Sequence, residues 1–202
     1  VTGFVVDNKY TISNITQNHT VSVVFDSASY NITAQTAKNG TISPSGVTSV
    51  KHGGSQKYLI VANFGYHLTG VSVDGVALPS TEVQNIATNG YTFADVVENH
   101  TISATFEKNV YTITAAASNN GTISPSGNIK VSFGDNKTFT LTAHKGYQID
   151  KIYIDNQVFE STTIYTFTDV DKNHSIYVSF KKITYSILAS CGANGTISPQ
   201  GT

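Results

Sequence analysis

The chain has 202 residues, of which 12 are lysine, none is arginine and 13 are acidic, so its net charge is -1. Nucleic-acid binding depends on basic patches and arginine forks, and this composition therefore argues against a nucleic-acid partner. No apolar run approaches the ~18 residues of a membrane-spanning helix, and Val1 begins no recognisable signal peptide, so we expect no membrane insertion in this segment. Cys191 is the only cysteine, which excludes a disulfide framework within the segment.

The chain is built from a tandem repeat. The octet NGTISPSG occurs at residues 39–46 and at 120–127, and a near copy, NGTISPQG, occurs at 194–201. The offset of 81 residues (121 − 40) between the first two copies holds without a gap through GYHLTGVSVDG at 65–75 and GYQIDKIYIDN at 146–156. We therefore expect the C-terminal part of a repeat at 1–29, complete repeats at 30–109 and 110–183, and the N-terminal part of a further repeat at 184–202.

Apolar residues alternate with polar ones inside each repeat, which is the pattern of strands with one buried face. In the second complete repeat this alternation covers 111–115, 129–133, 139–141, 152–154 and 176–180. No window longer than a few residues has helical spacing. The pattern predicts an all-β fold in which each repeat is a small β-sandwich of about six or seven short strands.

Turn residues separate these strands. Asn-Gly and proline in the octet are typical of tight turns, and Asp-Gly or Asp-Asn after a strand is typical of a hairpin, because these residues tolerate positive φ. A phosphate-binding loop would need a lysine and a following helix, and the octet has neither, so we expect no cofactor. The predicted structural turns are Gly40, Pro44, Gly46, Asp74, Gly75, Gly121, Pro125, Gly127, Asp155 and Asn156.

A loop of variable length precedes the last strand of each repeat. Asp74 and His100 are 26 residues apart (100 − 74), whereas Asp155 and His174 are 19 apart (174 − 155). The histidines follow an asparagine just before the strand, so we interpret Asn-His as turn chemistry. Histidines at equivalent positions of separate repeats are too distant to form one metal site, and no nucleophile motif is present, so we expect neither a metal site nor catalysis.

The pattern Asn-x-Ser/Thr is frequent, and it is the acceptor signal for N-glycosylation in exported proteins. Several copies arise from the repeat itself, since NGT and NHT recur. The candidate glycosylation sites are Asn14, Asn18, Asn31, Asn39, Asn99, Asn120, Asn136, Asn173 and Asn194.

The repeat written in full, with NGTISPSG, GY, VDG, YTF and NHTISATF in that order, resembles the divergent internalin-B-type B-repeat family over essentially the whole chain. The resemblance implies an extracellular or cell-surface location and a role as a stalk, spacer or adhesive array, without catalytic residues. It also implies a β-grasp-like fold as an alternative to the sandwich.

Our main functional expectation is a non-catalytic extracellular structural repeat, a stalk, spacer or filament-forming segment of a longer surface protein. Short linkers at 107–109 and 181–183 would limit bending between repeats. Its partners would be neighbouring repeats of the same polypeptide or other copies in a filament. Two alternatives stay open: an adhesin or carbohydrate-binding repeat that contacts surface glycans or proteins through exposed aromatic residues near 158–159, and an accessory module of a secreted enzyme.

Overall fold

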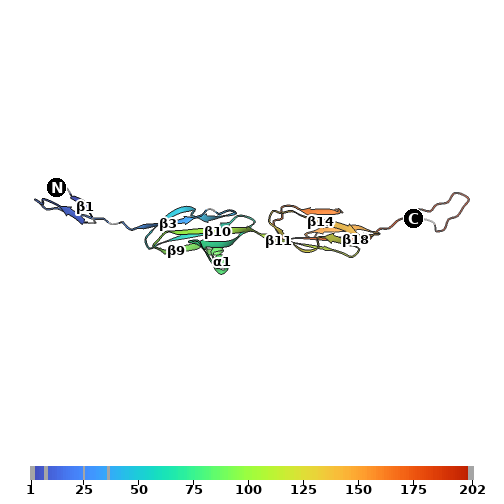
Figure 1. Ribbon diagram of the computed structural model, residues 1–202. Coiled ribbons are helices and arrows are strands. Elements are labelled where there is room, and N and C mark those ends of the chain that lie inside the picture. Colours follow the sequence, from blue (N-terminus) through green and yellow to red (C-terminus); the bar gives the residue numbers. More distant parts are fainter. Residues whose placement is uncertain (1–2, 7–8, 25, 36, 200–202) are drawn as a thin grey trace.

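The computed structural model describes residues 3–6, 9–24, 26–35 and 37–199. Figure 1 shows two β-rich units in line, with the N-terminal and C-terminal segments leaving at opposite ends of an elongated molecule. The N-terminal segment contains a hairpin of strands β1 (Gly3–Val6) and β2 (Lys9–Ile12). The two units correspond to the two complete repeats.

The described residues of the first repeat form eight strands and one helix. Five strands form one sheet in the order β5-β3-β10-β7-β8, and three form a second sheet in the order β4-β6-β9. The elements are β3 (Ser29–Ala34), β4 (Gly40–Ser43), β5 (Gly46–Lys51), β6 (Gly54–Ala62), β7 (Tyr66–Val73), β8 (Val76–Ala77), α1 (Ser80–Asn89), β9 (Tyr91–Val96) and β10 (His100–Lys108).

The second repeat has the same strand order without the helix. Its sheets are β13-β11-β18-β15-β16 and β12-β14-β17. The strands are β11 (Val110–Ala117), β12 (Gly121–Ser124), β13 (Gly127–Ser132), β14 (Lys137–Ala143), β15 (Tyr147–Ile154), β16 (Gln157–Phe159), β17 (Ile164–Phe167) and β18 (His174–Lys182). The predicted fold class, tandem β-sandwich-like repeats, is confirmed.

The first and last strands of each repeat pair in parallel at the centre of the larger sheet, β3 with β10 and β11 with β18. Antiparallel neighbours flank this pair on both sides. Because the first strand enters and the last strand leaves in the same direction, the chain passes from one repeat to the next along a single axis (Figure 1).

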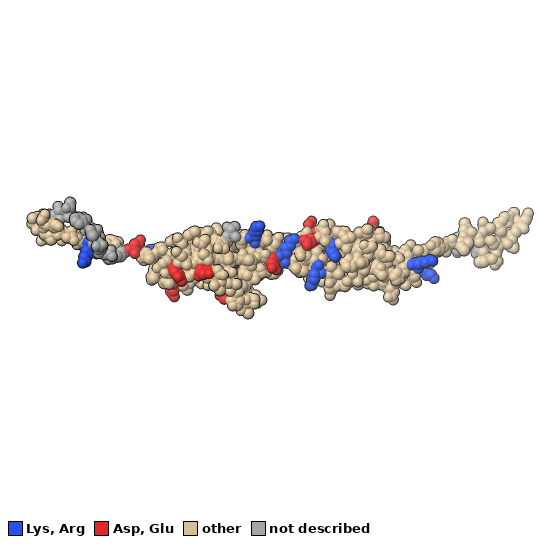
Figure 2. All heavy atoms as spheres, in the orientation of Figure 1, with Lys and Arg blue, Asp and Glu red and all other residues tan. Residues whose placement is uncertain are grey.

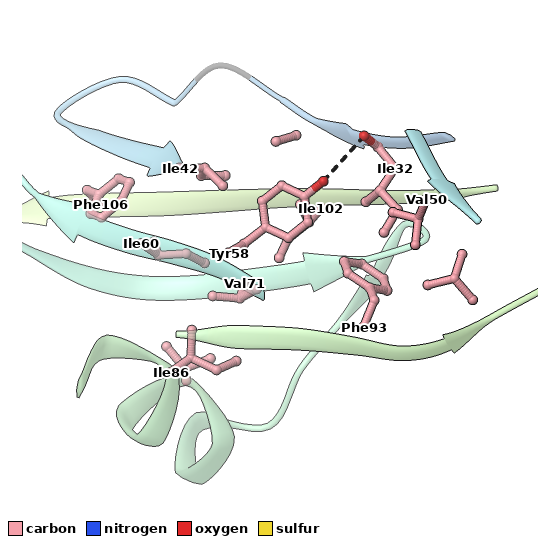
Figure 3. Packing of buried hydrophobic residues seen from close by; sticks show 13 residues of the cluster. Ile32, Ile42, Val50, Tyr58, Ile60, Val71, Ile86, Phe93, Ile102 and Phe106 are labelled. Atoms are coloured by element: carbon pink, nitrogen blue, oxygen red, sulfur yellow. Dashed lines mark hydrogen bonds between the residues drawn. The ribbon is translucent and has the colours of Figure 1, made fainter. Parts of the chain in front are cut away.

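The hydrophobic core lies between the two sheets. In the first repeat Ile32, Tyr58 and Ile102 are fully buried and point toward one another (Figure 3). The Tyr58 hydroxyl donates a hydrogen bond to the Ile32 carbonyl at 3.5 Å, so its single polar atom is paired inside the core. Phe139 replaces Tyr58 in the second repeat and needs no such partner. The period-2 alternation therefore marks the faces that are buried.

The first repeat contains one short helix, although no window of the sequence longer than a few residues has helical spacing. Helix α1 lies in the variable loop and buries only Val83 and Ile86, three residues apart, while its other residues are polar except for Ala87. Two apolar positions are too few to produce a helical period in the sequence, and the helix is stabilised by packing on β6 and β7. The second repeat, all of whose residues the structure describes, has a shorter loop and no helix. The β-grasp alternative therefore lacks its helix there.

Candidate functional site: the joint between the repeats

A single residue, Asn109, connects the last strand of the first repeat to the first strand of the second. Its amide donates a hydrogen bond of 2.8 Å to the Gly65 carbonyl, and its own carbonyl accepts one of 2.8 Å from the Phe133 amide. Its side-chain Oδ1 lies 3.0 Å from Nδ1 of His67. The connecting residue is therefore bonded to both repeats, which leaves it little rotational freedom.

Phe133 of the second repeat packs onto the C-terminal end of the first. It lies in the turn between β13 and β14, with its ring centroid 5.2 Å from that of Phe64 and 6.2 Å from that of Tyr66, both in edge-to-face geometry. Gly65 has φ +81°, and a Cβ there would overlap the Phe133 ring. We call the contact of Phe64, Gly65, Tyr66, Asn109 and Phe133 the joint. Aromatic pairs of this kind add about 0.5–1.5 kcal/mol beyond their buried area.

An ion pair lies beside the joint. Lys108 Nζ donates to Asp135 Oδ1 at 2.9 Å, and this hydrogen bond raises the pKa of Lys108 above its ordinary value. Both side chains are well exposed, so water and salt screen the attraction. On the face shown in Figure 2, charged side chains are scattered along the molecule without a large patch of one sign. The joint is therefore held mainly by apolar and backbone contacts.

A second recurring contact joins the hairpin turn after β7 or β15 to the start of the last strand of each repeat. In the first repeat Nδ1 of His100 lies 2.7 Å from Oδ2 of Asp74, while Oδ1 of Asp74 accepts a hydrogen bond of 2.7 Å from the Thr101 amide. The His100 ring also packs on Phe93, with centroids 4.9 Å apart. Burial alone would raise the pKa of Asp74, but the hydrogen bonds and charge of its partners hold that pKa below its ordinary value.

The second repeat has the same contact with nearly identical geometry. Nδ1 of His174 lies 2.7 Å from Oδ2 of Asp155, and the Ser175 amide donates to Oδ1 at 2.8 Å. The His174 ring packs on Phe167 at 4.7 Å. Here too the pKa of Asp155 is lowered by these partners against the opposing effect of burial. The pair fastens the β15–β16 turn to the start of β18 and is a structural contact in both repeats.

The predicted hairpin turns lie where two residues in succession have positive φ. Asp74 and Gly75 have φ of 51° and 78° between β7 and β8, and Asp155 and Asn156 have φ of 50° and 65° between β15 and β16. Positive φ at both central residues is the geometry of the two-residue hairpin turn whose twist matches that of the flanking strands. These turns place the aspartates opposite the histidines.

The octet has a more specific role than a turn. Gly40 is the first residue of β4 and is buried beneath the ring of Phe106, since a Cβ on Gly40 would overlap that ring. Gly121 and Phe180 repeat the arrangement in the second repeat. The peptide bonds before Pro44, Pro125 and Pro199 are cis, and Gly46 and Gly127 begin the next strand with φ of 73° and 88°.

The candidate glycosylation sites lie at the surface, except that Asn120 is half-buried. Three of their side chains accept hydrogen bonds within the fold. Asn99 Oδ1 accepts one of 2.8 Å from the Asn31 amide, Asn136 Oδ1 one of 2.9 Å from the Asp169 amide, and Asn173 Oδ1 one of 2.8 Å from the Thr112 amide. Modification of any of the nine stays a prediction.

Exposed aromatic side chains were expected near 158–159, where the aliphatic Val158 is 62% exposed and the aromatic Phe159 is 43% exposed. Strand pairing places Val158 beside Tyr153, which in turn pairs with Tyr177 across the solvent-facing side of the larger sheet. The Tyr153 and Tyr177 rings are 6.0 Å apart. The first repeat has Ser72 paired with Ser103 at these positions, so this aromatic surface does not recur.

Sequence reasoning missed the residues of the joint and the Asp–His contact. Phe133 appeared only as part of a turn, although a large apolar side chain in a turn between strands is a signal for a contact outside its own core. Asp74 and His100, like Asp155 and His174, kept their identities across a loop of changing length, and that persistence indicated a pair. In the N-terminal segment the corresponding aspartate, Asp7, lies outside the described residues.

No group of three or more histidine, cysteine, aspartate or glutamate residues that could hold a metal ion occurs within the described ranges. Among those same residues, no helix has the length and apolar character needed to cross a membrane.

Residues 30–110 and 111–184 each match the divergent InlB B-repeat domain. No curated protein and no solved structure matches the chain. The two matched segments contain both hydrophobic cores, and their boundary falls one residue beyond Asn109, at the joint. The chain therefore belongs to the divergent InlB B-repeat family and contains two consecutive copies of its repeat.

Proposed function

We propose that this chain is a non-catalytic extracellular spacer, a semi-rigid segment that holds other parts of a surface protein at a distance. The family supports a surface repeat module. The observation that carries the spacer role is the packing of Phe133 on Gly65 across a connection of one residue. A connection of this length with contacts on both sides restricts bending, which a spacer requires and a flexible tether does not.

The proposal is tested by the distance distribution between the two repeats. Glu98 and Lys172 occupy equivalent exposed positions before the last strand of each repeat. Changing both to cysteine, with Cys191→Ser to remove the native thiol, allows two spin labels to be attached to the full chain. Pulsed electron resonance should then give a narrow distance distribution that broadens in the Phe133→Ala variant.

A matched control keeps the change in side-chain size but moves it away from the joint. Tyr177→Ala removes a partly exposed aromatic residue from the open face of the same repeat and should leave the distribution narrow. A parent chain whose distribution is already as broad as that of Phe133→Ala would contradict the spacer role.

A second candidate function, glycan binding by the second repeat, is favoured by the Tyr153–Tyr177 pair. Paired aromatic faces beside neutral polar groups suit the apolar face of a sugar ring, and Thr114 and Asn128 lie on the same face of the sheet. A glycan-array screen of the full chain and of Tyr177→Ala tests it. Signals that the two proteins share, or no signal at all, would remove this candidate.

A further inference from the structure

The C-terminal end of the second repeat has the same backbone geometry as the half of the joint that belongs to the first repeat. Gly146 has φ +85°, against +81° for Gly65. The Ile183 amide donates to the Gly146 carbonyl at 2.9 Å, just as Asn109 donates to Gly65 at 2.8 Å. Tyr147 follows Gly146 as Tyr66 follows Gly65, and the Tyr147 amide donates to the His144 carbonyl at 3.0 Å. We call Lys145, Gly146 and Tyr147 the end surface.

The two ends differ in what covers them. Gly65 is buried, because the Phe133 ring lies where its Cβ would be. Gly146 is exposed, and a Cβ there would meet no described atom within 4 Å. Gly146 therefore has nearly the same backbone conformation as Gly65, which accepts the Phe133 ring in the joint, but the space above Gly146 is open. The end surface is therefore a preformed acceptor that is uncovered in the described part of the chain.

The opposite end of each repeat presents a ring. In the second repeat the ring is Phe133, whose amide donates to the Asn109 carbonyl. In the first repeat His52 takes the equivalent place (133 − 81 = 52) in the turn between β5 and β6, and its amide donates to the Ala28 carbonyl at 2.7 Å. The glycine that follows each ring has positive φ, +74° at Gly53 and +76° at Gly134. Both repeats thus carry a ring at the N-terminal end and an acceptor glycine at the C-terminal end.

We propose that the end surface is the docking site for the ring in the β13–β14-type turn of a further repeat that follows Ile183 on the same polypeptide. The proposal rests on the spacer function and names the partner of its free end. Residues 184–202 reproduce the start of the module with an offset of 74 (194 − 120), so the chain direction at Ile183 already leads into such a repeat. Continuity with the joint selects this occupant. Ile183 aligns with Asn109 (183 − 74 = 109), so the connection to the further repeat would also be one residue long.

One substitution changes the chemistry of the second site. Lys145 stands where the first repeat has Phe64 (145 − 81 = 64), so an incoming ring would contact Gly146 and Tyr147 and meet the stem and ammonium of a lysine rather than a second ring. A lysine over an aromatic face is an attractive contact. The docking site therefore still prefers an aromatic ring over an aliphatic side chain.

The test completes the third repeat. Thr202 aligns with Asn128 (202 − 74 = 128), so adding a copy of residues 129–183 after Thr202 produces a full module whose ring is a copy of Phe133. In nitrogen-15 correlation spectra the Gly146, Tyr147 and Ile183 amide signals should move relative to those of the 202-residue chain. Changing the copied Phe133 to Ala should return them, whereas changing the copied Tyr177 to Ala should not.

Two results would overturn the proposal. One is a third repeat that folds, with dispersed signals of its own, while the Gly146 and Tyr147 signals are the same with and without the copied ring. The other is a concentration-dependent movement of those signals in the 202-residue chain that His52→Ala abolishes, which would assign the site to a second copy. Neither result depends on the Glu98–Lys172 distance, so the spacer function and this site fail separately.

Discussion

Phe133 and Gly65 belong to different repeats, yet the Phe133 ring fills the space that any side chain on residue 65 would need. Gly65 is thus required twice, once for its φ of +81° and once for the close approach of the ring. Gly146 has the first requirement without the second, because its φ is +85° and the space above it is open. This difference separates the backbone role of the glycine from its role in the contact.

The variants Gly65→Ala and Gly146→Ala form a matched pair. Each should lose about 1–3 kcal/mol of stability from a side chain at positive φ. Gly65→Ala should in addition displace Phe133 and broaden the distance distribution between labels on Glu98 and Lys172, which Gly146→Ala should leave unchanged. Equal broadening in both variants would show that the ring contact does not order the repeats.

The Lys108–Asp135 ion pair should contribute little to the order of the repeats. Asp135→Ala removes the carboxylate from an exposed pair, and such pairs are screened by water and salt. We expect the inter-repeat distance distribution of Asp135→Ala to match that of the parent chain at both about 20 mM and about 500 mM salt. The lower concentration screens charges weakly and the higher one screens them strongly. A broadening as large as that of Phe133→Ala would reverse this assignment.

The Asp155–His174 contact should make the second repeat sensitive to acid. Because the pKa of Asp155 is lowered in the folded state, its contribution to stability is complete above the unfolded pKa of about 3.9 and is lost as the pH falls through the folded value. Asp155→Asn keeps an acceptor for the Ser175 amide but removes the charge. The side chain is 41% exposed, so screening limits the expected loss at pH 7 to about 1 kcal/mol.

Urea unfolding at pH 7 and pH 3, followed by signals from each repeat, measures this effect. The difference in stability between the two pH values should shrink for the second repeat of Asp155→Asn. The first repeat retains Asp74 and serves as the internal control, so its pH dependence should not change. An unchanged difference in the second repeat would mean that Asp155 is not the titrating group.

Helix α1 should stabilise only the first repeat. Ile86 is 2% exposed, and Ile86→Ala removes buried methyl groups at an expected cost of about 2–4 kcal/mol. Glu82→Ala, on the exposed side of the same helix, should cost less than about 0.5 kcal/mol. Urea unfolding monitored separately for each repeat should show the loss in the first repeat alone. A parallel loss in the second repeat would instead indicate that the two cores unfold as one unit.

Much of the fold was predictable because its signals are local. Ile152 and Ile154 alternate with polar neighbours, and the structure buries both on one face of β15. Asp74-Gly75 and the octet mark reversals through residues that tolerate positive φ. Eight strands were found per repeat against six or seven expected, since β8 and β16 have only two and three residues.

The candidate site was less predictable because its contacts join residues far apart in the sequence. Phe133 is 68 positions (133 − 65) from Gly65, and no local pattern connects a turn in one repeat to a turn in the one before it. Helix α1 was missed for a related reason, since Val83 and Ile86 become helical positions only when β6 and β7 lie beside them.

By itself, then, the sequence determined the repeat, its strands and its tight turns, since alternation and turn chemistry depend on neighbouring residues. Only the tertiary structure decided the parallel pairing of β3 with β10, the Asp74–His100 contact and the Phe133 contact with Gly65. The physical reason is that these three arise after chain folding brings distant segments together, and their energies depend on distances and packing that no local pattern records.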